Sequence, residues 1–129
     1  MKEIEQNFDE LHNEAMLLAE RALSMKKGGN VNRDLPLFAQ AFDFECQAAM
    51  LYVNDYENEP RRSVFFRSAA WMAFHAEEFR EAERMACFGL SGEPPAPVNW
   101  ELRDVLTLCL AYFHSISTSK KCSKKREKQ

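Results

Sequence analysis

The side chains best suited to chemistry in this sequence lie close together, in residues 61–75. They are three arginines, two large aromatic residues and one histidine: Arg61, Arg62, Arg67, Trp71, Phe74 and His75. A guanidinium group offers a planar fork of donors to anionic groups. Large aromatic side chains dominate many protein interfaces, and histidine can transfer a proton near neutral pH. A plainer interpretation makes the aromatic residues core, the arginines a solvated or internally paired face, and the histidine a local hydrogen-bonding group.

Metal and cofactor sites have no matching pattern in the sequence. The four cysteines, at positions 46, 87, 109 and 122, form no Cys-x-x-Cys pair and have no histidine at metal-ligand spacing. A di-metal carboxylate bundle needs two Glu-x-x-His units, and only residues 9–12 approach that spacing. Glycine-rich phosphate loops, Walker sequences and nucleophile motifs are missing too. We therefore predict a noncatalytic protein without a metal or a cofactor.

The composition is that of one folded domain. The 129 residues are 46% hydrophobic, which is enough to bury a core. The first nine residues are too charged for a signal peptide, and the sequence contains no run of about 18 apolar residues that could span a bilayer. Cysteines without a disulfide pattern fit a reducing compartment. We therefore expect a cytoplasmic protein that does not associate with a membrane.

Charge is distributed unevenly along the chain. Residues 120–129 contain six Lys or Arg and one Glu, so eleven of the 17 basic and nineteen of the 20 acidic residues precede them. The remainder of the chain therefore has a net charge of −8. We predict one helical domain in residues 1–118 and a disordered basic tail in residues 119–129. Such a tail could contact an anionic partner, but we do not expect nucleic-acid binding.

Apolar residues recur at steps of three and four, as one face of a helix requires. Glycine, proline and polar capping residues separate these stretches, notably at Gly28-Gly29, Pro36, Pro60, Pro94-Pro95 and Asn99. The pattern predicts helices at residues 4–26, 34–58, 60–75, 78–90 and 99–118. Residues 60–75 are apolar nearly all round, so this helix should lie between neighbours. Residues 99–118 have more apolar faces than a terminal helix needs, so this helix either caps the core deeply or meets a second chain.

A spacing of 34 residues relates two parts of the chain. It separates Pro60 from Pro94 and Ala48 from Ala82, and each proline follows its alanine by 12 residues. Paired helices with this period are typical of tetratricopeptide repeats, and residues 63–96 resemble one such repeat. The matching positions are Phe66, Ala69, Ala70, Phe79, Ala82, Ala86, Gly89 and Pro94. Two positions depart from the pattern: Ala73 stands where tyrosine is common, and Glu77 where glycine often makes the turn.

The resemblance implies a five-helix, all-α, tetratricopeptide-like array of helical hairpins. Its leading helices would line a concave groove, with Val64, Arg67, Ser68, Trp71, Phe74 and His75 facing it. Arg67 would occupy a position that carries a basic residue for a carboxylate in some peptide-binding members. Trp71 replaces the amide side chain that those members usually have. We therefore predict an adaptor that binds a protein or peptide segment, with or without acidic groups, in a groove lined by the third helix.

Two alternatives remain open. Arg67 and His75 resemble the Arg and His of HEPN-type ribonucleases, which are small helical proteins that dimerise, although seven residues separate the two here. In such an enzyme the histidine would act as acid and base and the arginine would bind the phosphate. The other alternative is a structural homo-oligomer, such as a homodimer, that forms through the fifth helix.

Overall fold

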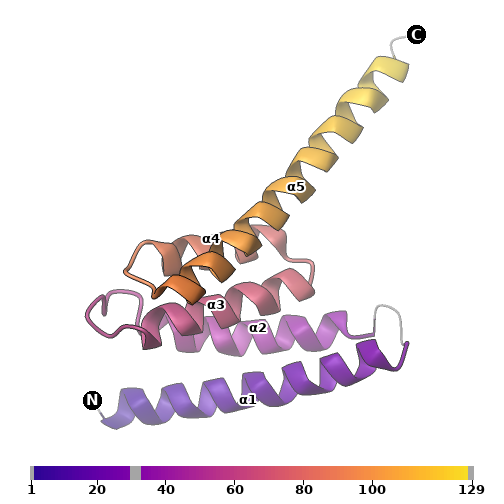
Figure 1. The fold of residues 1–129 in the computed structure, drawn as a ribbon. Coiled ribbons are helices and arrows are strands. Elements are labelled where there is room, and N and C mark those ends of the chain that lie inside the picture. Colours follow the sequence, from indigo (N-terminus) through magenta and orange to yellow (C-terminus); the bar gives the residue numbers. More distant parts are fainter. Residues whose placement is uncertain (1, 30–32, 128–129) are drawn as a thin grey trace.

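The chain folds into five helices. The computed structural model describes residues 2–29 and 33–127, with side chains for residues 6–29 and 33–117. All regular structure in these residues is helical, and Figure 1 shows the five elements in order. They are α1 (Lys2–Lys27), α2 (Leu35–Met50), α3 (Arg61–His75), α4 (Phe79–Leu90) and α5 (Ala96–Glu127). The predicted all-α fold, an array of helical hairpins, is confirmed.

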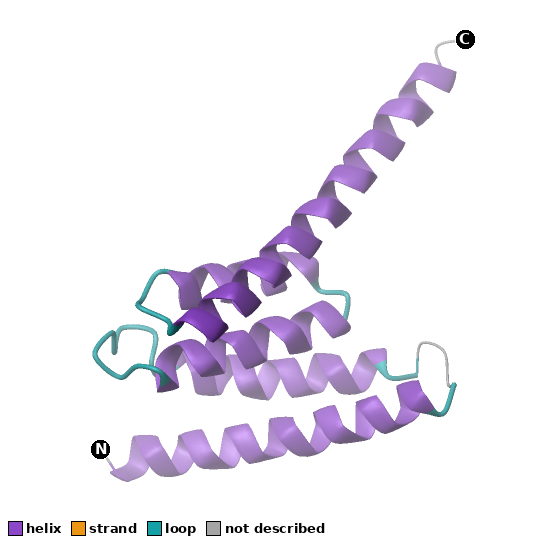
Figure 2. Cartoon of the chain, viewed as in Figure 1, coloured by secondary structure: helices purple, strands orange, loops and turns teal. Residues whose placement is uncertain are grey.

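Each helix packs on the next one along the chain, and α3 also contacts α5. The loops from α2 to α3, from α3 to α4 and from α4 to α5 lie at alternate ends of the array, so successive helices are antiparallel (Figure 2). Helices α1, α3 and α5 therefore begin at the same end. These are the leading helices of the hairpins, and their alignment places one face of each on the same side of the molecule (Figure 1).

Small residues occupy the closest helix contacts. Ala69, Ala82 and Ala86 are completely buried. Gly89 of α4 lies so near its neighbours that a Cβ atom there would be 2.9 Å from Leu102 Cδ1 and 3.2 Å from Phe66 Cβ. Three helices thus meet at Gly89, because α4 can approach α3 and α5 only where it has no side chain.

Helix α2 ends earlier than predicted. It stops at Met50, whereas the prediction continued it to residue 58, and residues 51–60 form turns. Asparagine and aspartate are frequent in this segment, and their side chains compete for backbone hydrogen bonds. A tertiary contact also fixes the turns, because the Arg62 guanidinium donates two hydrogen bonds to the Val53 carbonyl oxygen, at 3.1 and 3.0 Å. The bond between Glu59 and Pro60 is cis.

Helix α5 is longer than predicted at both ends. It begins at Ala96, because Pro97 is tolerated in a first turn. Asn99, predicted as the N-cap, lies inside the helix, where its Oδ1 accepts a hydrogen bond from Arg103 Nε at 3.0 Å. Residues 119–127, predicted as part of a disordered tail, continue α5. No glycine or proline interrupts them, and lysine and arginine favour the last turns of a helix. Residues 128–129 of the predicted tail lie outside the described residues.

We expect Gly89→Val to destabilise the protein. Its side chain would add three carbons at a contact where the first already meets Leu102 and Phe66, both completely buried. Overpacking of this kind costs about 2 kcal/mol. The free energy of unfolding from urea titrations measures the loss. Cys87→Val, at an exposed position of the same helix, is the control and should change it by less than about 0.5 kcal/mol. Equal values for the two variants would contradict the close approach at Gly89.

Candidate functional site

A surface hollow lies between the leading helices. Its volume is about 440 Å³. Helix α3 forms its centre, α1 forms one wall, and α2 and α5 contribute one residue each. The lining residues are Met16, Ala19, Leu23, Phe38, Arg67, Ser68, Trp71, Met72, His75 and Glu101. We call this the leading-helix hollow. Three of the predicted site residues, Arg67, Trp71 and His75, lie in it together.

Arg67 already has an anionic partner in the hollow. Its Nη1 atom lies 3.3 Å from Oε2 of Glu101, so the ion pair joins α3 to α5. Both side chains reach solvent, with 30% of Arg67 and 44% of Glu101 exposed. Solvent screening limits such a pair to about 1 kcal/mol or less. A partner carboxylate could therefore replace Glu101 at the guanidinium group at small cost, but it would not find Arg67 unpaired.

Trp71 and His75 form the aromatic part of the hollow. The Trp71 ring is half-buried, with its centroid 6.0 Å from the His75 ring, and His75 stacks on Phe38 at 5.0 Å. Burial lowers the pKa of His75 and the positive charge of Lys26 adds to this shift, while Asp34 opposes both. The imidazole is therefore neutral at neutral pH, and it offers a partner a hydrogen-bonding group rather than a positive charge.

Arg62 has a different role from the predicted one. Its side chain is completely buried, where it donates to the Val53 carbonyl oxygen and, at 3.3 Å, to Ser91 Oγ. Its guanidinium carbon lies 4.4 Å from the centre of the Tyr56 ring. Arg62 thus ties the turns after α2 to the end of α4. The prediction that it binds a partner is wrong, because a partner cannot reach it.

The other predicted residues also lie outside the hollow. The Arg61 guanidinium lies over the rings of Phe8, Tyr52 and Phe65, 4.8 Å from the Phe8 centroid. Its Nη2 atom is 3.8 Å from Oδ1 of Asp9. Phe74 contacts Trp71 and His75, and on its other side Phe79 of α4, at 5.4 Å, but it does not line the hollow. Val64 is partly buried against the core. Of the residues implied by the resemblance, those on the Arg67, Ser68, Trp71 and His75 stripe therefore form the site.

A buried polar cluster lies under one end of the hollow. Glu45 of α2 is completely buried, and its Oε2 accepts a hydrogen bond from Ser68 Oγ at 2.7 Å. His12 Nδ1 lies 2.9 and 3.0 Å from the two carboxylate oxygens. Burial raises the pKa of Glu45, while the hydrogen bonds from His12 and Ser68 oppose the shift. The cluster joins α1, α2 and α3.

Sequence reasoning missed this cluster, although one signal for it exists. Glu45 lies on the same helical stripe as the buried residues Phe38, Ala41, Ala48 and Tyr52. A carboxylate on an apolar stripe must find partners when the stripe is buried. Its partners lie 33 and 23 residues away along the chain, on two other helices, so the stripe identifies the buried acid but does not name them.

The arrangement of Ser68, Glu45 and His12 differs from that of a catalytic triad. In a serine triad, histidine lies between the serine and the carboxylate and takes the serine proton. Here the carboxylate lies in the middle, and Ser68 donates to it directly. Among the described residues no group of three or more His, Cys, Asp or Glu side chains could hold a metal ion. The cluster therefore acts as a polar clamp between helices.

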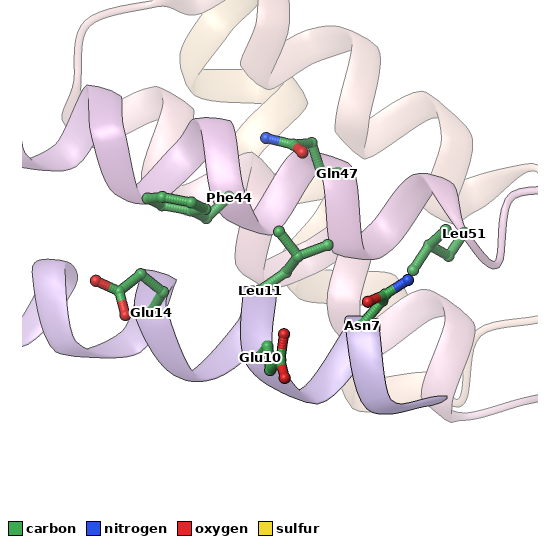
Figure 3. A pocket seen from close by; sticks show the side chains of 7 residues that line it. All are labelled: Asn7, Glu10, Leu11, Glu14, Phe44, Gln47 and Leu51. Carbon is green, nitrogen blue, oxygen red and sulfur yellow. The ribbon is translucent and has the colours of Figure 1, made fainter. Parts of the chain in front are cut away.

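A second recess lies along the seam between α1 and α2. Figure 3 shows the side chains that line it: Asn7, Glu10, Leu11, Glu14, Phe44, Gln47 and Leu51. Leu11 and Phe44 form its apolar part and the remaining groups are polar or lie at its ends. None of the residues predicted to bind a partner takes part in it.

The chain has no match among protein-family models, curated proteins or solved structures. Within the described range, none of the helices combines the length and apolarity needed to cross a membrane. The functional argument therefore depends on the geometry of the hollow.

We expect Glu45→Gln to remove a pH dependence of stability. Because the pKa of Glu45 is raised in the folded protein, the folded state holds this proton more tightly than the unfolded chain does. The resulting stabilisation is complete below the ordinary pKa of glutamate and is lost as pH rises through the raised pKa. The free energy of unfolding of the wild type, minus that of the variant, should therefore increase as pH falls from about 7 to about 4.

Urea titrations at several pH values measure this difference, whose slope cannot exceed about 1.4 kcal/mol per pH unit for one proton. Glutamine keeps the size of the side chain but replaces one oxygen acceptor with an amide donor, so the change of the difference with pH, rather than its value at one pH, reports the titration. A difference that stays constant or decreases toward acidic pH would contradict burial as the dominant influence on Glu45.

Proposed function

We propose that this chain is a noncatalytic protein-binding module, a tetratricopeptide-like array that holds a segment of another protein in the leading-helix hollow. One observation carries the proposal. Arg67, Trp71 and His75, chosen from the repeat pattern alone, line one accessible hollow together with residues of α1 and α5. In a stacked array of helical hairpins, this side of the leading helices forms the concave binding surface.

The packing of the second hairpin supports the same classification. Ala82, Ala86 and Gly89, the small positions of the repeat pattern, are all buried where α4 meets its neighbours. Glu77, which replaces the turn glycine of the pattern, has a φ of 61°, a conformation that favours glycine. The chain thus makes the turn that the pattern calls for, with a residue that is less suited to it.

The lining of the hollow defines the chemistry of the partner. Met16 and Leu23 of α1 are exposed beside Trp71 of α3, so a large apolar side chain of the partner would be enclosed between the two helices. The Arg67–Glu101 pair offers both a donor and an acceptor at the other wall. The partner is therefore a peptide segment with an apolar anchor flanked by polar groups, and an acidic group is accommodated but not required.

The ribonuclease alternative has less support. Arg67 and His75 do line the same hollow. However, Glu101 occupies the anion-binding side of Arg67, so a phosphate group would have to displace it, whereas a peptide need not. The same carboxylate can remain beside a peptide, whose backbone amides donate hydrogen bonds to it. The geometry therefore favours a peptide over a nucleic acid.

We expect Trp71→Ala to weaken peptide binding about tenfold or more, because a central aromatic anchor contributes strongly to an interface. Peptides selected from a random displayed library against the full chain provide the ligands, and fluorescence anisotropy measures their affinity. Trp100→Ala is the matched control, since Trp100 is 65% exposed on α5 and lies outside the hollow.

Circular dichroism establishes that both variants remain folded. The proposal predicts loss of affinity in Trp71→Ala alone. Failure to select any peptide, or equal affinities for the two variants, would show that the hollow is not the binding site.

A further inference from the structure

Helix α5 is apolar on more sides than the rest of the chain covers. Its Leu102, Val105 and Cys109 are completely buried against α3 and α4. On another side Leu110 is 67% exposed. Leu106 and Phe113, four residues before it and three after it, lie on the same side and are partly buried against the core. A helix with apolar residues all round belongs between neighbours. In the described part of the chain, the main neighbours of α5 are α3 and α4.

The exposed side of α5 around Leu110 has the position that a trailing helix takes in the other two hairpins. Helix α1 is paired with α2, and α3 with α4, but α5 is a leading helix that the described chain leaves without a trailing partner. Arrays of hairpins need a cap where the stacking ends. A trailing helix would run antiparallel to α5, as α2 and α4 do to their leading helices.

The far half of α5 also needs a neighbour. Beyond Ile116, which still borders the start of α4, the helix continues to Glu127 and leaves the body of the protein (Figure 1). A helical segment of this length is only marginally stable in water by itself, because nucleation is costly and few hydrogen bonds repay it. Packing against another helix would stabilise it.

A second copy of this chain satisfies these requirements. We propose that two copies form a two-fold symmetric dimer in which their α5 helices pair antiparallel, centred on Leu110. Each α5 then serves as the trailing helix of the other, and the Leu106, Leu110 and Phe113 stripe faces its own counterpart. The same surface is used on both copies, as two-fold symmetry demands.

Charge selects the antiparallel arrangement. In this register, residues 120–126 of one copy lie beside residues 94–100 of the other. The first segment contains five Lys or Arg residues. Next to the second segment lies a recess whose lining includes Glu57, Glu59 and Glu93. A parallel pair would instead bring the two basic segments together.

The dimer leaves the leading-helix hollow open. Leu110 and Glu101 are nine residues apart, and at about 100° per residue they lie on opposite sides of α5. Dimerisation and peptide binding therefore use different faces, and either proposal can fail without the other.

Cysteine cross-linking tests the arrangement directly. In a Cys87→Ser, Cys122→Ser background, Leu110→Cys should form a disulfide-linked dimer under mild oxidation, because residue 110 meets its counterpart at the two-fold axis. Leu17→Cys in the same background is the control: Leu17 is 58% exposed on α1 and should give no more linked dimer than the background alone. Equal cross-linking of the two variants would overturn the proposal.

Light scattering of the unmodified chain gives the second test. The wild type should have the mass of a dimer, and Leu110→Glu should raise the dissociation constant about 100-fold or more without loss of helicity, because two carboxylates would meet in an apolar contact. Lys124→Glu with Lys125→Glu should also weaken the dimer, and salt should reduce that difference. A monomeric wild type, or a dimer unaffected by Leu110→Glu, would overturn the proposal.

Discussion

The buried carboxylate of Glu45 sets the distance between the first two leading helices. It accepts a hydrogen bond from Ser68 of α3 and contacts His12 of α1, so both helices are held to α2 at the position of Glu45. A buried charge without partners would cost several kcal/mol, so α1 and α3 cannot move apart at this level without a large penalty. The leading-helix hollow begins beside this clamp, because Ser68 belongs to both.

Arg62 and Arg67 lie on the same helix, α3, but the surrounding helices bury the first and leave the second at the surface. Arg62 points to the end of the array, where a carbonyl oxygen, a hydroxyl group and an aromatic ring surround it. Arg67 lies little more than one turn later, in the hollow, where 30% of its side chain is exposed to solvent. The first arginine holds the connecting turns in place. The second, with Glu101, gives the hollow a polar wall.

The two ends of the helical array differ in the surface that their outermost helices, α1 and α5, present. At the first hairpin, α1 is covered by α2, and charged residues such as Glu20 and Arg21 are exposed on it. At the other end, α5 presents an apolar stripe and continues past the body. A second copy packed against α5 would bury Leu110. It would also place the basic residues near the end of α5 beside the acidic body of the other copy.

The sequence by itself determined the helices and the small residues that allow them to pack. Periodic apolar residues predict α1, α3 and α4 closely, because helix formation is local and Gly28-Gly29 and Pro60 interrupt it. Ala82 and Gly89, two of the small positions of the repeat resemblance, are buried where α4 meets its neighbours.

Only the tertiary structure decided which polar side chains are buried. Glu45 meets residues from two other helices, and Arg62 reaches a carbonyl in the turns that end α2 early. Neither partner can be read from local spacing, since burial changes the cost of a charge only after distant helices have met. The same reason separates Arg62 from Arg67: their sequence environments are alike, and the surrounding helices make one of them a clamp and the other part of a surface.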